Sequence, residues 1–213
     1  MKHFALIWDM DGTLVDSYPA IVPAARETLA EFGLALSEEE IRREVLGSSV
    51  GALLQRIARE QGWDPAPVQA AFQRRNDSRI ETIRPMLHAR DCLETLASAG
   101  CRSFVYTHRG VSCPAILAHT GLRPYFTELV TALEGFPRKP SPEGILYLLE
   151  KYALDPAACF YVGDRRLDME AAENAGVGGI FYAPPETPVL PTGRERFVVS
   201  DLLEIPALLK GER

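Results

Sequence analysis

The sequence predicts an α/β protein, with a doubly wound parallel-sheet (Rossmann-like) core and an inserted all-helical cap domain. Three observations indicate this fold. The chain opens with a short, continuously apolar segment, 4–8, that stops at acidic residues, as strands buried on both faces of a parallel sheet do. From 18 to about 85 the pattern is helical and contains no convincing strand. After Pro85, strands and helices alternate, as they do around a parallel sheet.

Length and composition limit the classes of protein to consider. The 213 residues are 46% hydrophobic and 24% charged, which excludes a disordered chain and allows a core without disulfides or metals. A formal net charge of -6 argues against a nucleic-acid partner, and no apolar run is long enough for a signal peptide or a membrane span. The cysteines are scattered, without metal-ligand spacing, which favours a reducing compartment: Cys92, Cys101, Cys113 and Cys159. We expect a cytoplasmic monomer or homodimer.

The helical segment is expected to contain at least four helices. The first has an apolar face that ends at Phe32, with Gly33 as its C-cap. The second begins at Ser37, with Glu40 in the capping-box position. A third follows Gly47-Ser48-Ser49, and a fourth occupies 68–83. We therefore assign 17–84 to the cap and 1–16 with 85–213 to the catalytic core.

The core segments follow the rhythm of a doubly wound sheet. In order we expect a helix at 91–99, a strand at 103–107, a helix at 112–119, a strand near 129–130, a helix at 141–152, a strand at 159–162, a helix at 167–175, strands near 180 and 197–199, and a helix at 201–210. The proline-rich stretch 184–191 is expected to be a surface loop. The first strand must then pair with strands that follow the insertion, and ligands bind beyond the carboxyl ends of such strands. The insertion leaves the chain at this edge, so we expect it to cover the site.

Two acids follow the first strand directly. Asp9 and Asp11 are two apart, so an extended backbone would point both carboxylates to one side, and Gly12 lets the chain turn. Like charges this close need a raised pKa or a bound cation, so the pair is a candidate for metal binding or acid-base chemistry. An Asx-rich turn is the alternative.

Later segments bring further polar groups to the same edge. Thr107 ends one predicted strand, and Asp164 follows another, with Asp168 four residues on at the start of a helix. Acids at a helix N-terminus also have a purely structural explanation, because the helix dipole favours them. Lys139 lies between prolines before a helix, and a solvated loop lysine is its alternative reading.

Taken in order, these elements resemble the four signature motifs of the haloacid dehalogenase superfamily. They are Asp9-Met10-Asp11-Gly12-Thr13, Thr107, Lys139, and the Gly163-Asp164 segment with Asp168, and the similarity covers nearly the whole chain. The helical insertion after the first motif looks like the subgroup with a small α-helical cap, which includes phosphoglycolate phosphatase-like and β-phosphoglucomutase-like proteins.

The resemblance implies a mechanism. Asp9 would attack phosphorus to form an aspartyl-phosphate, and Asp11 would protonate the leaving alcohol and then activate water. Mg²⁺ would be held by Asp9, the main-chain carbonyl of Asp11, and Asp164, with Asp168 supporting or completing the shell. Lys139 would offset negative charge in the transition state. Haloacid dehalogenases lack an acid at the place of Asp11, so its presence favours phosphoryl transfer.

Several weaker candidates remain. Thr107 would bind the phosphoryl oxygens, and the two residues after it, His108 and Arg109, depart from the commonest pattern and either touch substrate or form a surface pair. The turn Gly47-Ser48-Ser49 resembles the loop with which relatives read the leaving group, although a plain interhelical turn explains it equally well. Arg165 stands where a serine is frequent, and it either pairs with neighbouring acids or adds positive potential at the site.

The sequence therefore predicts a Mg²⁺-dependent phosphatase acting on a small phosphorylated metabolite. A phosphomutase, which returns the phosphoryl group to its substrate, is the nearest alternative. A noncatalytic binding or regulatory protein of the same fold is an alternative of another class, and the full complement of expected catalytic residues counts against it.

Overall fold

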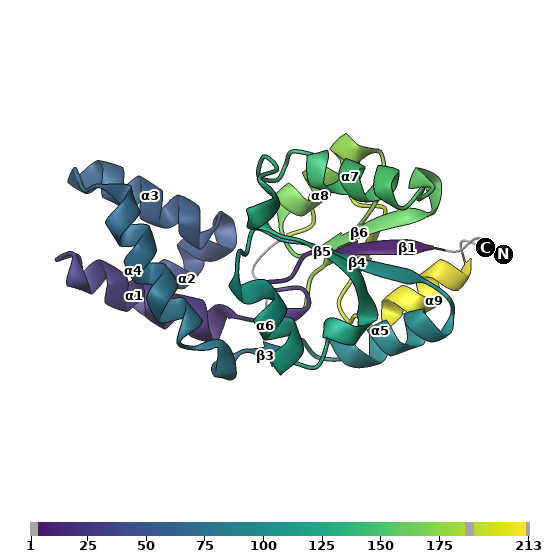
Figure 1. The fold of residues 1–213 in the computed structure, drawn as a ribbon, viewed down its shortest axis with the longest axis horizontal. Helices are drawn as coiled ribbons and strands as arrows, with labels where there is room; N and C mark the ends of the chain where they lie inside the picture. Colours follow the sequence, from purple (N-terminus) through teal and green to yellow (C-terminus); the bar gives the residue numbers. More distant parts are fainter. Residues whose placement is uncertain (1–3, 186–189, 212–213) are drawn as a thin grey trace. The chain divides into compact units, whose positions relative to one another are not determined.

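The chain forms two compact units, one of residues Met1–Asp16 with Pro85–Arg213 and one of residues Ser17–Arg84 (Figure 1). The computed structural model describes residues 4–185 and 190–211, so residues 186–189 of the predicted loop 184–191 lie outside the described residues.

The first unit is built on a parallel sheet. Its strands lie in the order β5 (Phe126–Val130), β4 (Arg102–Tyr106), β1 (Ala5–Trp8), β6 (Cys159–Gly163), β7 (Gly178–Tyr182) and β8 (Phe197–Val199). Strand β1 pairs in parallel with both β4 and β6, so the first strand of the chain lies between two strands that follow the helical insertion. The predicted doubly wound α/β core is confirmed.

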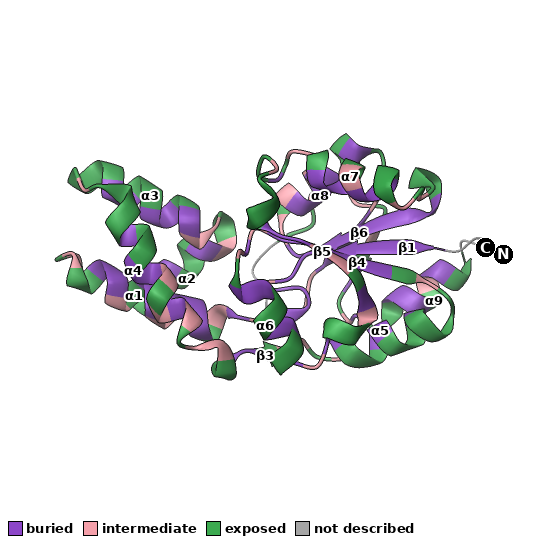
Figure 2. Ribbon diagram, in the orientation of Figure 1, coloured by how far each residue is buried: buried purple, intermediate pink, exposed green. Residues whose placement is uncertain are grey.

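Helices cover both faces of this sheet (Figure 1). Helices α7 (Glu143–Lys151) and α8 (Arg166–Ala175) lie on one face. Helices α5 (Ala89–Ser98), α6 (Ser112–His119) and α9 (Glu204–Gly211) lie on the other. Short 3-10 turns connect the elements: η2 (Arg123–Tyr125), η3 (Ala132–Glu134) and η4 (Pro156–Ala158). The strands are mostly buried, whereas these helices bury one side and expose the other (Figure 2).

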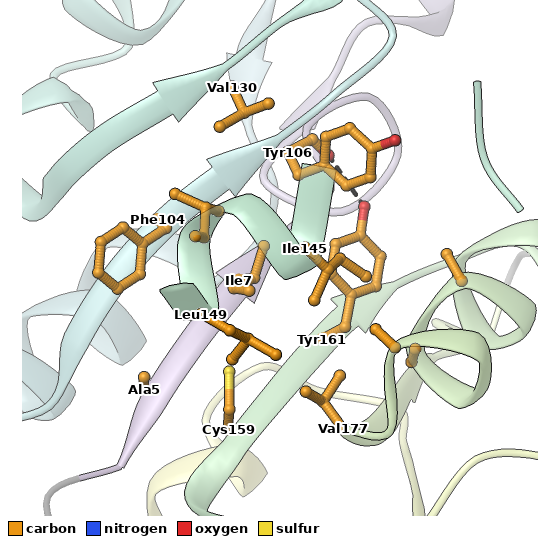
Figure 3. Close-up of a cluster of buried hydrophobic side chains, with 14 of the residues drawn as sticks. Ala5, Ile7, Phe104, Tyr106, Val130, Ile145, Leu149, Cys159, Tyr161 and Val177 are labelled. Atoms are coloured by element: carbon orange, nitrogen blue, oxygen red, sulfur yellow. Dashed lines mark hydrogen bonds between the residues drawn. The ribbon is translucent and has the colours of Figure 1, made fainter. Parts of the chain in front are cut away.

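A cluster of buried side chains fills the space between the sheet and helices α7 and α8 (Figure 3). Ile7 of β1, Phe104 of β4 and Tyr161 of β6 pack here with Ile145 of α7, as alternate residues of neighbouring strands must when they share a face. The Tyr161 hydroxyl donates a hydrogen bond to the Tyr106 carbonyl oxygen at 2.9 Å. The polar end of this tyrosine therefore lies toward the carboxyl ends of the strands.

The second unit is helical, as predicted for the insertion. It contains α1 (Tyr18–Glu31), α2 (Glu38–Gly47), α3 (Val50–Gln61), α4 (Pro65–Asp77) and the 3-10 turn η1 (Ile80–Thr82) around a separate apolar core. The capping box of Ser37 and Glu40 is confirmed, because each side chain accepts from the other residue's backbone N–H. Gly33 follows the first helix in the left-handed region, with φ +89°.

The last helix of this unit differs from the sequence prediction of a helix at 68–83. Helix α4 begins at Pro65, three residues before the predicted start at 68. The Asp64 side chain caps it by accepting a hydrogen bond from the Ala66 N–H. The helix ends at Asp77, where the Ser78 hydroxyl donates to the Arg75 carbonyl and so competes with the backbone hydrogen bonds that would continue the helix.

The strand pair β2 (Val15–Asp16) and β3 (Arg84–Pro85) forms a second, two-stranded sheet. Across the described part of the chain, no helix combines the length and apolar character that spanning a membrane requires.

Candidate active site

The parallel strands bring three predicted residues to one edge of the sheet. Asp9 follows β1, Thr107 follows β4 and Asp164 follows β6, and these three strands are neighbours. The backbone N–H of Asp9 donates to Val162 of β6 at 2.8 Å, so the ladder continues to the acidic residue itself. The convergence follows from topology, because parallel strands end at the same edge.

The loop after β1 is a tight turn around Met10. The Met10 carbonyl oxygen accepts the backbone N–H groups of Leu14 at 2.9 Å and Val15 at 3.0 Å. Gly12 has φ +86°, and a Cβ at this position would lie 2.4 Å from an oxygen of Asp164. Glycine is therefore required twice over, for the backbone conformation and for the approach of the carboxylate.

Three buried carboxylates form the centre of the site. Asp9, Asp164 and Asp168 are 1%, 2% and 0% exposed, and each offers an oxygen within 4.8 Å of the other two. Gly163 permits this packing, since a Cβ there would lie 2.4 Å from the Cβ of Asp168. Burial of three acids together requires compensating positive charge.

Lys139 supplies part of that charge. Its Nζ lies 2.5 Å from Asp9 Oδ1 and 2.6 Å from Asp168 Oδ1, and it donates to the Tyr161 hydroxyl at 2.8 Å. The side chain is fully buried. Lys139 therefore bridges the first and last acidic motifs from within the protein.

Arg165 supplies the second positive charge. Its Nη2 lies 3.3 Å from Asp9 Oδ2, and its backbone N–H donates to Asp168 at 3.0 Å. Burial alone would raise the pKa of Asp9, but the charges of Lys139 and Arg165 outweigh burial and lower it. Asp9 is thus kept as a carboxylate, the form that a nucleophile needs.

Asp164 has the opposite tendency. Burial, together with the nearby charges of Asp168 and Asp9, raises the pKa of Asp164 to about 7, although Arg165 acts against this. When all three acids are ionised, they exceed the two cations by one negative charge, which a further cation would balance. Carboxylate oxygens in this number are the ligands that Mg²⁺ prefers. The donor atoms therefore fit a divalent cation held by Asp9, Asp164 and Asp168.

Asp11 lies apart from the three-carboxylate cluster. Its side chain is 23% exposed, and its carboxylate pairs with the guanidinium of Arg109, with Nη2 at 2.6 Å from Oδ1. That the Asp9 and Asp11 carboxylates point to one side of an extended backbone stays a prediction. A metal contact through the main-chain carbonyl of Asp11 stays a prediction.

The residues after β4 are held by local bonds. The Thr107 hydroxyl accepts the Arg109 backbone N–H at 3.1 Å, and His108 Nε2 accepts the Lys139 backbone N–H at 2.7 Å. Burial, with the charges of Lys139, Arg138 and Arg165, lowers the pKa of His108 to about 2. His108 is therefore a neutral imidazole that ties the β4 edge to the lysine loop.

The turn at Gly47, Ser48 and Ser49 belongs to the helical unit. The Ser48 hydroxyl donates to the Glu44 carbonyl at 3.0 Å, and the Ser49 hydroxyl caps α3 by accepting the Ala52 N–H at 3.1 Å. Both serines therefore have local structural roles. Their part in reading a leaving group stays a prediction.

Sequence reasoning gave no role to two residues that complete the cluster. The Thr13 hydroxyl donates to Asp164 at 3.1 Å and thereby joins the first motif to the last. Tyr161 supports Lys139 from the core, and its only signal in the sequence was a tyrosine in an otherwise apolar strand, since a buried hydroxyl needs partners.

Comparison with known proteins agrees with this geometry. The family of haloacid dehalogenase-like hydrolases matches residues 6–181. A phosphoglycolate phosphatase of Rhodobacter capsulatus is 31% identical over 188 residues, which cover 84% of this chain and 83% of that protein. A hydrolase from Streptococcus pneumoniae TIGR4 is 32% identical, with a TM-score of 0.61 and coverage of 86% of this chain and 94% of that one. A haloacid dehalogenase-superfamily hydrolase of subfamily IA from Geobacter sulfurreducens is 26% identical, with a TM-score of 0.73 over 98% of this chain and 97% of that one. The resemblance seen in the motifs is confirmed, and the chain belongs to the haloacid dehalogenase-like hydrolase family.

Proposed function

We propose that this hydrolase is a Mg²⁺-dependent phosphatase that acts on a small phosphorylated metabolite through an aspartyl-phosphate on Asp9. The observation that carries the proposal is the buried lysine bridge: Lys139 contacts both Asp9 and Asp168 and, with Arg165, keeps Asp9 ionised in a site from which water is largely excluded. A buried carboxylate in this form is an activated nucleophile.

The proposal also gives roles to the surrounding residues. Asp9 attacks phosphorus, and Asp11 gives a proton to the leaving alcohol and later takes one from water. Lys139 and Arg165 reduce the repulsion between Asp9 and a phosphate dianion. Thr107, at the end of β4 beside Asp9, binds phosphoryl oxygens. Mg²⁺, held by Asp9, Asp164 and Asp168, would supply charge neutralisation and orientation of the phosphoryl group.

The comparisons support a phosphatase and give a first substrate to test. The curated relatives from Rhodobacter capsulatus and Vibrio parahaemolyticus are named phosphoglycolate phosphatase. We therefore place phosphoglycolate first in a panel that also contains hexose phosphates, nucleotides and acyl phosphates. The cytoplasmic location expected from the sequence remains part of the proposal.

The proposal is tested by phosphate release with Mg²⁺ or with chelator, for the unaltered enzyme and for Asp9→Asn. We expect release only with Mg²⁺ and only with Asp9, and a phosphoryl group on the peptide that contains Asp9 after rapid acid quenching. Asp155→Asn is the matched control, because Asp155 is exposed and caps a surface turn, a role that asparagine performs equally well.

Three outcomes would contradict it. Release that persists in chelator or in Asp9→Asn would exclude the mechanism. Interconversion of hexose phosphates without net release would show a phosphomutase. Absence of turnover on the whole panel, with no binding of phosphate analogues, would favour a noncatalytic role.

A further inference from the structure

Arg109 makes the most extensive charged contact with the candidate acid-base residue. Its Nε lies 3.1 Å from each carboxylate oxygen of Asp11, and its Nη2 lies 2.6 Å from Oδ1. The two residues are 98 positions apart in the sequence. A planar guanidinium that contacts both oxygens fixes the plane of a carboxylate as well as its distance.

The arginine is the better-anchored partner of the pair. Its backbone N–H donates to the Thr107 hydroxyl at 3.1 Å, and its carbonyl oxygen accepts the Ala132 N–H at 3.0 Å. Its Nη1 also lies 3.4 Å from the Ser112 hydroxyl. The Arg109 side chain is 5% exposed, against 23% for Asp11. The more exposed carboxylate is therefore oriented by the buried guanidinium.

This pair is separate from the ionic group around the nucleophile. Asp9 and Asp168 both pair with Lys139 and Arg165, whereas Asp11 has its own arginine from the β4 edge. The candidate nucleophile Asp9 and the candidate acid-base residue Asp11 are thus balanced by different cations. The Asp11 carboxylate is held by Arg109, whose backbone N–H is in turn bonded to the Thr107 hydroxyl.

We propose that Arg109 is a positioning residue that fixes the Asp11 carboxylate for proton transfer to the leaving group. The inference rests on the proposed function, in which Asp11 is the acid-base residue. It is an alternative to the expectation that Arg109 touches substrate, because Nε and Nη2 of the guanidinium contact Asp11. A misplaced general acid lowers the rate most for substrates whose leaving group must be protonated as it departs.

The test uses this dependence on the leaving group. For the Mg²⁺-loaded enzyme, kcat/KM is measured on phosphoglycolate or another alkyl phosphate, whose leaving group is poor, and on p-nitrophenyl phosphate, whose leaving group departs without a proton. We expect Arg109→Met to lower kcat/KM on the alkyl phosphate by roughly 10²-fold and on p-nitrophenyl phosphate far less. Arg109→Lys keeps the positive charge but loses the forked guanidinium, so its kcat/KM on the alkyl phosphate should lie between those of the unaltered enzyme and Arg109→Met.

Two controls separate positioning from general damage. Arg166→Met removes an exposed arginine that pairs with Glu170, and should leave both values unchanged. In an Asp11→Asn background, which should itself lose activity selectively on the alkyl phosphate, Arg109→Lys should have little further effect. This second comparison also decides the matter if Arg109→Met does not fold.

Equal losses on both ester classes, or a raised KM with unchanged kcat, would overturn the inference and indicate a substrate contact or a structural role. Failure of the proposed function looks different: the unaltered enzyme would release no phosphate from either ester, or Asp9→Asn would stay active.

Discussion

Replacement of Lys139 by methionine tests the electrostatics of the site most directly. The change keeps the length of the side chain but removes the ammonium group that contacts Asp9, Asp168 and the Tyr161 hydroxyl. Two carboxylates that are 1% and 0% exposed then lose the nearer of the two cations that they share, and Arg165 remains. Removal of one partner from a buried ion pair costs about 3–5 kcal/mol, because the remaining charge stays buried without compensation.

We therefore expect the metal-free variant at neutral pH to be less stable than the unaltered protein by about 3–5 kcal/mol. Mg²⁺ should restore part of this loss, because a cation that binds the folded site alone stabilises it by mass action. Phosphate release should be lost with or without Mg²⁺, since in the proposed mechanism Lys139 also offsets the charge of the phosphate.

The assay is urea unfolding followed by tryptophan fluorescence. Trp8 is fully buried in β1 and reports on the first unit, whereas Trp63 lies against Phe32 in the helical unit. A Trp63→Phe background therefore isolates the signal of the unit that holds the site. Lys151→Met is the matched control, because Lys151 pairs with Glu128 on the surface with 46% of its side chain exposed.

The surface control should be destabilised much less than Lys139→Met, since exposed ion pairs contribute little to stability. If the two lysine variants unfold at the same urea concentration, or if Mg²⁺ gives Lys139→Met no added stability, then the buried charges are not organised as described.

Two further predictions concern His108 and Gly12. The pKa of His108 is lowered from 6.5 to about 2, so below pH 6.5 the unfolded chain binds a proton that the folded chain does not. Stability should fall with falling pH below 6.5, by up to about 1.4 kcal/mol per pH unit from this group, and urea titrations of His108→Gln, which keeps an acceptor, should show a shallower decline. An equally steep decline in both would contradict the assignment. Gly12→Ala and Gly33→Ala both place alanine at positive φ, which costs about 1–2 kcal/mol, but only the first would meet a side chain, that of Asp164. Gly12→Ala alone should weaken Mg²⁺ binding in calorimetric titration, and equal binding by both variants would count against the close packing.

The fold could be predicted because it depends on patterns that the chain repeats. The short apolar strand before Asp9 and the alternation after Pro85 indicate a parallel sheet, and the ends of parallel strands meet at one edge. Asp9, Thr107 and Asp164 could be brought together on these grounds alone. Helix ends were predicted less well where Ser78 and its neighbours compete with the backbone for hydrogen bonds.

The partners of the site residues could not be predicted in the same way. Asp11 pairs with Arg109, and Asp9 pairs with Arg165. Both pairings depend on side-chain directions that arise only when distant strands pack. The sequence showed that Arg109 and Arg165 were unusual for the family pattern, but it left open whether they face substrate, solvent or an acid. The support given to Lys139 by Tyr161 likewise joins a strand to a loop 22 residues away.

The central position of β1 also governs when a growing chain can assemble its site. Strand β1 bonds to β4 and β6, which leave the ribosome only after the entire helical unit at Ser17–Arg84. That unit has its own apolar core, and domains generally fold as units during synthesis. The insertion is thus expected to fold while the strand before it has no partner. A nascent or cleaved product that ends before Asp168 would lack one of the two carboxylates that Lys139 bridges, so we expect it to be inactive.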